Sequence, residues 1–175
     1  MHTDLFTSRA SDTALGLAGV GTGVMAGVFH AFDTAVMPAL AETDDRTFVD
    51  TMRSVNRLIE NPVFGLAYVG ALAAPAAAAV LLHRAGRRRA ARWAAGAALC
   101  YGAAVVVTSA VNLPLNARLA RTPDATAARA GFERRWNTAN TARTVLTVAA
   151  AACVGRAATL RERGTSRAGE STGSA

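Results

Sequence analysis

His30 and Asp33 are the side chains best suited to acid–base chemistry, and both lie late in a long apolar stretch, residues 13–37. A carboxylate at the centre of a bilayer costs about 3 kcal/mol on insertion scales. Ionisable groups kept inside a membrane segment at such a cost usually have a function and a partner. We expect Asp33 to pair with His30 or Arg143. The alternative for His30 is a hydrogen-bonded core residue.

Two carboxamide side chains mark the end of another apolar stretch. Asn112 and Asn116 flank Pro114 at the point where uncharged residues give way to Asn-Ala-Arg. Two interpretations are open. The three residues either cap and stop a helix, or they belong to a site built where helices end.

Trp136, Asn140 and Arg143 form a third group, spaced four and three residues apart. Tryptophan is common at the bilayer interface, so Trp136 could be an anchor and Arg143 could simply flank a membrane segment. In the other interpretation the arginine and the carboxamides donate hydrogen bonds to a ligand oxygen.

The elements that must position these groups are long apolar blocks. The chain is 51% hydrophobic, and a segment of roughly 20 apolar residues spans a bilayer. The predicted spans are residues 13–37, 62–83, 93–111 and 143–160. The second and third spans lack the polar outer face of a soluble helix. We therefore predict an all-α fold, with a single four-helix transmembrane domain over residues 1–160 and a disordered tail over 161–175.

The first long connection, residues 42–61, has a helical period of its own. Phe48, Met52, Val55 and Ile59 recur on one face, with charged residues between them. This pattern predicts an amphipathic helix lying against the bundle or the bilayer interface.

The net charge of +7 comes from arginines that lie between or beside the apolar blocks. Such charges flank membrane spans, and they do not form the continuous basic surface of a nucleic-acid-binding protein. Five arginines and no acid lie in residues 84–92, between the second and third spans. The positive-inside rule places this connection and both termini in the cytoplasm.

An antiparallel four-helix bundle brings the polar residues to one end. The end of the first span, the start of the second, the end of the third and the start of the fourth share one membrane face. The residues found there are His30, Asp33, Asn56, Asn61, Asn112, Asn116, Trp136, Asn140 and Arg143. We expect them to surround a common pocket.

Glycines at positions 19, 23 and 27 indicate which face of the first span points inward. Small residues at this spacing let membrane helices approach closely. At about 100° per residue, His30 and Asp33 lie within roughly 20° and 40° of Gly19. We therefore expect both side chains to point into the bundle.

In matching order, the chain contains the stretches GVFHAFDTAVMPAL, MRSVNRLIENPVF, VNLPLNARLA and FERRWNTANTART. Over roughly Gly16 to Ala152 it resembles a family of small four-helix membrane proteins, bacterial proteins related to fungal anthrone oxygenases. The resemblance implies a protein integral to a bacterial cytoplasmic membrane. Characterised members oxidise an anthrone, a tricyclic aromatic ketone from polyketide synthesis, to the anthraquinone with molecular oxygen.

The resemblance and the shared location together suggest roles for the site residues. His30 is expected to be the base, oriented by Asp33, and Arg143 to stabilise an oxyanion with Asn112 and Asn140. The remaining substrate contacts are expected from Asn56, Asn116 and Trp136.

No cofactor and no metal is expected, because the sequence has no recognisable metal site, phosphate-binding loop or paired Cys motif. The expected partners are the lipid bilayer and a hydrophobic aromatic small molecule. The competing interpretation is a non-enzymatic accessory or lipid- or quinone-binding membrane protein, whose polar residues would form a structural network or a headgroup site.

Overall fold

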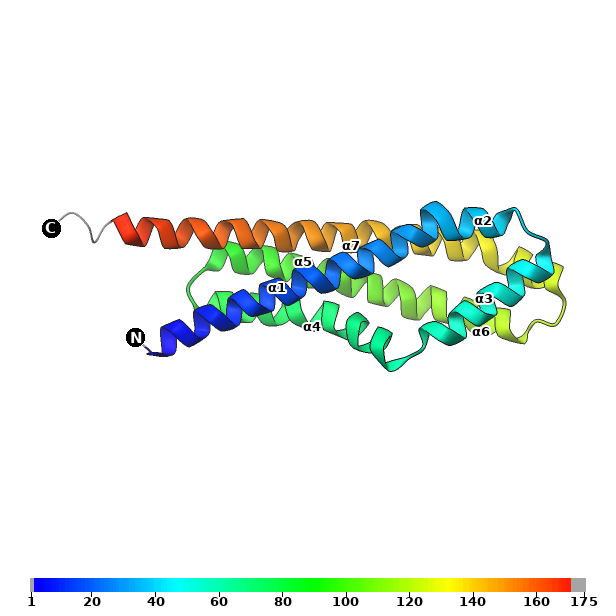
Figure 1. Cartoon of the computed structure of the whole chain (residues 1–175), viewed down its shortest axis with the longest axis horizontal. Coiled ribbons are helices and arrows are strands. Elements are labelled where there is room, and N and C mark those ends of the chain that lie inside the picture. The colour runs from blue at the N-terminus through cyan, green and yellow to red at the C-terminus, as the bar shows by residue number, and fades with distance from the viewer. Residues whose placement is uncertain (1, 171–175) are drawn as a thin grey trace.

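The chain is helical in a computed structural model that describes the backbone of residues 2–170 and the side chains of residues 9–160. In chain order the elements are α1 (His2–Ala31), η1 (Phe32–Val36), α2 (Met37–Ala41), α3 (Asp45–Ile59), α4 (Pro62–Arg84), α5 (Arg88–Val107), η2 (Thr108–Asn112), α6 (Leu113–Arg121) and α7 (Ala125–Glu170) (Figure 1). The elements named η are single π-helical segments, in which the backbone turns are wider than in an α-helix. The predicted all-α fold is confirmed.

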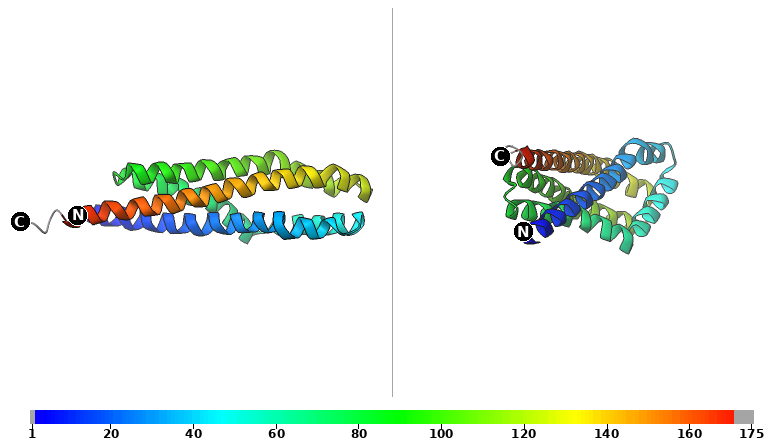
Figure 2. Two further views of the ribbon diagram at one scale, coloured as in Figure 1. Left: turned by 90° about the horizontal axis from the view of Figure 1, so that it is seen from above. Right: turned by 60° about the vertical axis from the view of Figure 1, so that its left-hand side comes forward.

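Four long helical columns pack as a ring (Figures 1 and 2). α1 packs against α4 and α7, and α5 packs against the same two helices. The segments long and apolar enough to cross a membrane are Arg9–Ala41, Pro62–Arg84, Arg88–Arg121 and Ala125–Leu160. The chain is therefore an integral membrane protein. The start of α1 and the end of α7 lie at the same end of the bundle.

The outside of the ring is apolar and its inside is packed with small residues. Large exposed side chains lie on all four columns, and they include Leu17, Val24, Leu66, Val80, Leu99, Val106, Val145 and Val148. The buried core has alanines at the centre, among them Ala18, Ala71, Ala78, Ala94, Ala97 and Ala150. Small core residues allow close helix packing while the large ones face lipid.

A second core extends the bundle beyond this ring. It is formed by α2, α3, α6 and the first turns of α7 around Phe48, Phe132 and Trp136. The first column, 33 residues from Arg9 to Ala41, is about 50 Å long, whereas a bilayer core is about 30 Å thick. The column is therefore longer than the hydrocarbon is thick, and α3 of the second core carries the exposed charges of Arg46 and Asp50.

The amphipathic helix predicted in the first long connection is confirmed as α3. Phe48 and Met52 of its apolar face are completely buried in the second core. The Asp44 carboxylate accepts hydrogen bonds from the backbone N–H groups of Arg46 and Thr47 at the start of the helix, each at 3.0 Å. The Thr47 hydroxyl donates a further bond of 2.7 Å, and these hydrogen bonds lower the pKa of Asp44.

Both π-helical segments end two residues before a proline. In a regular α-helix the proline ring clashes with the carbonyl four residues earlier. For Pro38 that carbonyl belongs to Thr34 in η1, and for Pro114 it belongs to Ala110 in η2. The wider turns let each column continue through its proline. Single π turns inside α-helices are frequent at functional sites.

The helix-capping interpretation of Asn112 and Asn116 is wrong. The column continues through Pro114 into α6, and the Asn112 side chain makes no capping hydrogen bond. Similarly, α7 begins at Ala125, well before the predicted fourth span at residue 143. Of the tail for which disorder is predicted, residues 161–170 continue the α7 backbone and residues 171–175 lie outside the described part.

Candidate functional site

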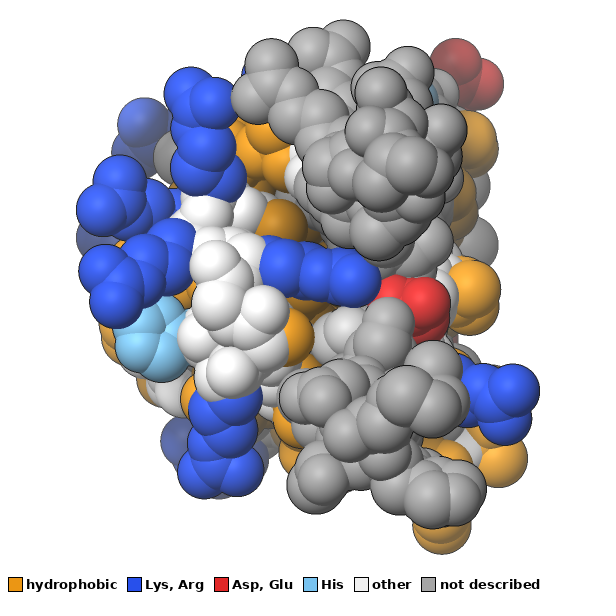
Figure 3. Space-filling view, turned by 90° about the vertical axis from the view of Figure 1, so that its left-hand side faces the viewer, with side chains coloured by type: hydrophobic (Ala, Val, Ile, Leu, Met, Phe, Trp, Pro, Cys, Tyr) orange, Lys and Arg blue, Asp and Glu red, His pale blue; other side chains and the backbone are white. Residues whose placement is uncertain are grey.

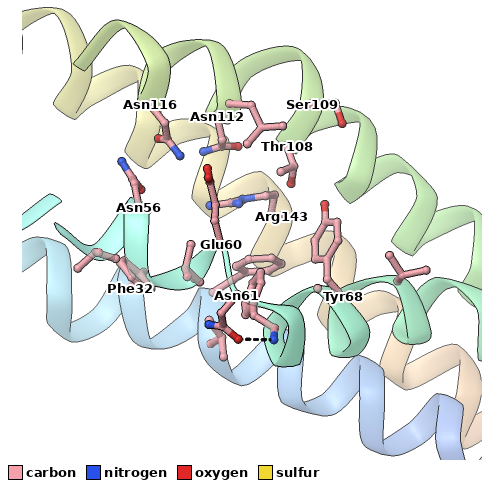
Figure 4. A pocket seen from close by; sticks show the side chains of 18 of the residues that line it. Phe32, Asn56, Glu60, Asn61, Tyr68, Thr108, Ser109, Asn112, Asn116 and Arg143 are labelled. Atoms are coloured by element: carbon pink, nitrogen blue, oxygen red, sulfur yellow. Dashed lines mark hydrogen bonds between the residues drawn. The ribbon is translucent and has the colours of Figure 1, made fainter. Parts of the chain in front are cut away.

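A cavity of about 480 Å³ lies between the two cores, at the level of both π-helical segments. Asn56 of α3 lies on one side of it, with Glu60 and Asn61 of the connection that follows α3. Asn112 and Asn116 lie across from them, and Arg143 comes from α7 behind (Figure 4). Apolar side chains complete the wall, including Val28, Phe29, Phe32, Val55, Ile59, Phe64 and Val69.

The break between α3 and α4 forms one wall of this cavity. α3 ends at Ile59, and Asn61 takes an extended conformation before Pro62 starts α4. The Asn61 side chain fixes the break, because it donates to the Leu58 carbonyl at 2.8 Å and accepts from the Phe64 N–H at 2.9 Å. Two separate helices therefore replace one continuous column here.

Arg143 is a buried cation without a direct counter-ion. Its side chain is 7% exposed, and none of the ion pairs among the described residues involves it. The guanidinium lies over the Phe29 ring at 4.3 Å and over the Trp136 ring at 5.4 Å, where cation–π attraction partly offsets burial. Its Nη2 donates to Asn140 Oδ1 at 2.7 Å, and its Nε has no partner.

Asn140 links Arg143 to a more distant carboxylate. Its Nδ2 donates to Asp33 Oδ1 at 2.6 Å and to the Phe29 carbonyl at 2.9 Å. The Thr144 hydroxyl donates to the other Asp33 oxygen at 2.6 Å. Asp33 and Asn140 therefore hold Arg143 from behind, and neither belongs to the cavity wall.

Other polar atoms at the cavity are buried and unpartnered. Asn112 is 1% exposed, and both its Oδ1 and its Nδ2 lack a hydrogen bond. Asn56 Nδ2 and the Tyr68 hydroxyl oxygen are also buried and also lack a hydrogen-bond partner. A buried polar group left unsatisfied costs about 1–3 kcal/mol. These atoms lie around one cavity, where a polar group placed inside it can satisfy them.

The sequence model of the anthrone oxygenase family matches residues 61–153, which is more than half of the chain. The chain belongs to this family. The matched segment runs from the start of α4 into α7 and includes Asn112, Trp136 and Arg143. No curated protein and no solved structure shows significant similarity to the chain. Family and fold together make it an oxygenase-like integral membrane protein.

Five of the eight site residues expected from the sequence line the cavity of this anthrone oxygenase family member. They are Asn56, Asn112, Asn116, Trp136 and Arg143. Trp136 donates from Nε1 to Asn116 Oδ1 at 3.1 Å, and its ring packs against Phe132 with centroids 5.8 Å apart. Trp136 therefore holds Asn116 in place and supports Arg143. The substrate-binding roles of the five residues stay predictions.

The expected inward direction of His30 is wrong. Its side chain is exposed on the outside of α1, and it neither lines the cavity nor contacts Asp33. The buried face of α1 passes through Ala18, Thr22 and Phe29, one residue away from the glycine series on which the expectation rested. Since one residue is about 100° around a helix, His30 points away from the bundle.

Glu60 is a cavity residue that the sequence did not single out. It lies at the α3–α4 break, and Figure 4 shows its carboxylate pointing towards the side of the cavity where Asn112 lies. Its side chain is exposed as well as lining the cavity, so its solvated position at the end of an amphipathic pattern gives no sign of a site. The adjacent Asn61-Pro62, which ends that helix, is the signal that could have placed it at a site.

The cavity reaches the exposed outer surface of the bundle. Val69 of α4 is 63% exposed and Leu113 of α6 is 47% exposed, and both line the cavity. Ser109 of η2, also exposed, lies on the same wall. Among the described residues no three His, Cys, Asp or Glu side chains come together as metal ligands would.

Proposed function

We propose that this protein uses molecular oxygen to oxidise an acidic aromatic ketone of the anthrone type to a quinone. The observation that carries the proposal is that buried Arg143 and unpartnered Asn112 both line one cavity whose wall is mostly apolar. The cavity volume of about 480 Å³ is within the range of small-molecule sites, roughly 300–1,000 Å³.

Arg143 and Asn112 are suited to stabilising a negative oxygen. The methylene of an anthrone lies between two aryl rings and is conjugated to the ketone, so its deprotonation places charge on the ketone oxygen. Donors fixed beforehand in a site with little water stabilise such charge strongly. Arg143 is held from behind by Asn140 and Asp33, so it needs little rearrangement to meet this oxygen.

Glu60 is the proposed base, in place of His30. Its carboxylate lines the cavity, and no hydrogen bond or ion pair engages it within the described part of the chain. A carboxylate on one side and cationic and amide donors on the other would separate the proton from the developing charge. The aromatic walls from Phe29, Phe32 and Phe64 match a flat hydrophobic substrate.

The oxygen step needs no group beyond the substrate anion and O2. The anion transfers one electron to O2, and the resulting radical and superoxide combine to a peroxide at the former methylene carbon. Protonation gives the hydroperoxide, which loses its remaining C–H proton as the O–O bond breaks. One anthrone and one O2 thereby give one anthraquinone and one water. The protein supplies proton transfer and charge stabilisation in a cavity with mostly apolar walls.

Substrate access from the bilayer fits the exposed apolar rim at Val69 and Leu113. If both termini are cytoplasmic, as the arginine distribution predicts, the cavity lies towards the opposite face of the membrane. A hydrophobic tricycle that partitions into lipid can reach the cavity without crossing the protein.

The direct test is oxygen uptake by the purified protein in detergent, with anthrone as substrate and protein-free buffer as the autoxidation control. We expect one O2 consumed per anthraquinone formed, at a rate well above the control. Replacing Arg143 by Gln should lower kcat by about 10²-fold, the usual loss for one oxyanion donor. Anthrone binding without turnover above the control would instead identify a binding protein.

A further inference from the structure

A groove of about 470 Å³ lies at the other end of the bundle, where α4 turns into α5. Its polar side chains are all basic: His83 and Arg84 from the last turn of α4, and Arg88 and Arg92 from the first turns of α5. This end is far from the cavity described above and has no part in the proposed oxidation. Figure 3 shows basic side chains gathered along one side of this end, with a histidine among them.

The turn between the helices holds these side chains together. Gly86 has a φ of 75°, a left-handed conformation that glycine adopts without steric cost. The Arg87 N–H reaches back to the Leu82 carbonyl at 2.9 Å, which closes the end of α4. Arg88 and Arg92, four residues apart, share one face of α5. The groove is therefore bounded by helix ends that a hydrogen-bonded turn joins.

No carboxylate among residues 9–160 forms an ion pair with the basic side chains of the groove. Residues 61–123, which include all of α4 and α5, contain no Asp or Glu. The three guanidinium groups around this hollow repel one another, so an anion bound between them would be stabilising.

The apolar side of the groove continues onto the lipid-facing surface. Val80 lines the groove and is 50% exposed, and Ala79 and Ala95 lie beside it. Trp93, next to Arg92, is 44% exposed, and tryptophan is enriched at the level of the lipid headgroups. A ligand that fits must therefore combine an anionic headgroup with hydrocarbon chains.

We propose that this groove binds the phosphate of an anionic phospholipid. The phosphate lies among Arg84, Arg88 and Arg92, and the acyl chains extend along Val80 on the outside of α4. Basic pockets between membrane helices are known to bind anionic lipid headgroups. A bound lipid would neutralise the helix ends and tie the α4–α5 turn to one leaflet.

Native mass spectrometry of the full chain in detergent, titrated with phosphatidylglycerol or phosphatidylcholine, tests this proposal. We expect the wild type to retain phosphatidylglycerol at about tenfold lower concentration than phosphatidylcholine. The double variant Arg88→Gln and Arg92→Gln should lose this preference, because each basic residue near an anionic surface contributes about fivefold. Changing both arginines to Lys should keep most of it.

The matched control is Arg118→Gln with Arg121→Gln, which removes the same charge from exposed positions at the other end. This variant should keep the wild-type preference. Equal binding of the two lipids by the wild type would overturn the proposal. An equal loss of the phosphatidylglycerol preference in the groove and control variants would also overturn it. That result would mean that the net charge of the protein, and not the groove, attracts the lipid. Size-exclusion profiles of all variants identify any that fail to fold.

Discussion

Arg143 and Asp33 carry opposite charges on neighbouring columns, and Asn140 lies between them. Asn140 accepts from Arg143 at 2.7 Å and donates to Asp33 at 2.6 Å. A direct salt bridge would neutralise the arginine, whereas this relay fixes its position and leaves its charge available to a ligand. The arrangement explains how a buried cation can be both rigid and ready to bind an anionic oxygen.

Asp33 is therefore a positioning residue, and its shape should matter more than its charge. Replacing Asp33 by Ala removes the acceptor of Asn140 and Thr144. We expect a loss of about 1–3 kcal/mol in stability, the usual cost of unsatisfied buried groups, together with a lower kcat. Asp33→Asn keeps an acceptor for Asn140 and should stay close to wild type in melting temperature. If Asp33→Asn lowers the melting temperature and kcat as much as Asp33→Ala does, the negative charge of Asp33 matters more than its shape.

Glu60 and His30 give opposite predictions for the proton-transfer step. Glu60→Gln keeps the size of the side chain but removes the base, so kcat for anthrone oxidation should fall by about 10²–10⁴-fold. His30→Ala changes a side chain on the outside of α1 and should leave kcat unchanged. Steady-state quinone formation measures both. A low kcat for His30→Ala together with a wild-type kcat for Glu60→Gln would assign the base to His30 instead of Glu60.

Two glycines of α4 test whether the cavity is the binding site. Gly65 lines the cavity and Gly70 does not, and a Cβ atom at either position meets nothing within 4 Å. Gly65→Leu should obstruct the cavity and raise KM about tenfold, equivalent to about 1.4 kcal/mol of binding. Gly70→Leu carries the same change in the same helix and should leave KM unaltered. Equal KM values for the two variants would mean that the substrate does not bind in this cavity.

The close approach of α1 and α4 occurs at Gly21. A Cβ atom there would lie 3.1 Å from the Ala71 Cα, so the helices would have to separate. A Cβ at Gly23 meets nothing within 4 Å. We expect Gly21→Ala to lower the melting temperature, while Gly23→Ala leaves it unchanged or raises it through better helix propensity. A higher melting temperature for the Gly21 variant would contradict this packing.

Features that depend on local periodicity could be predicted from the sequence. The apolar blocks predict the four columns, and the spacing of Phe48 and Met52 predicts α3. The convergence of Asn112, Trp136 and Arg143 follows from antiparallel topology alone, because it depends on which helix ends meet and not on exact side-chain directions.

Features that depend on tertiary contacts could not be predicted in this way. The buried face of α1 differs by one residue from its glycine series, and both faces are rich in small side chains. The contact between Gly21 and Ala71 decides between them, and no pattern within α1 contains that information. Pro114 predicts a helix end by local rules, yet the π-helical turns of η2 let the column continue.

The central claim is that Arg143 binds the anionic oxygen of an aromatic ligand, and fluorescence titration with two anthracene probes tests it most directly. Anthracene-9-carboxylate is a stable tricyclic anion, and 9-methylanthracene is a neutral molecule of similar shape. We predict that the wild type prefers the carboxylate by about tenfold or more, since a hydrogen bond to a charged group contributes about 1.5–3 kcal/mol. Arg143→Gln should abolish this preference while still binding the neutral probe. The absence of any preference in the wild type, or its persistence in the variant, would contradict the account.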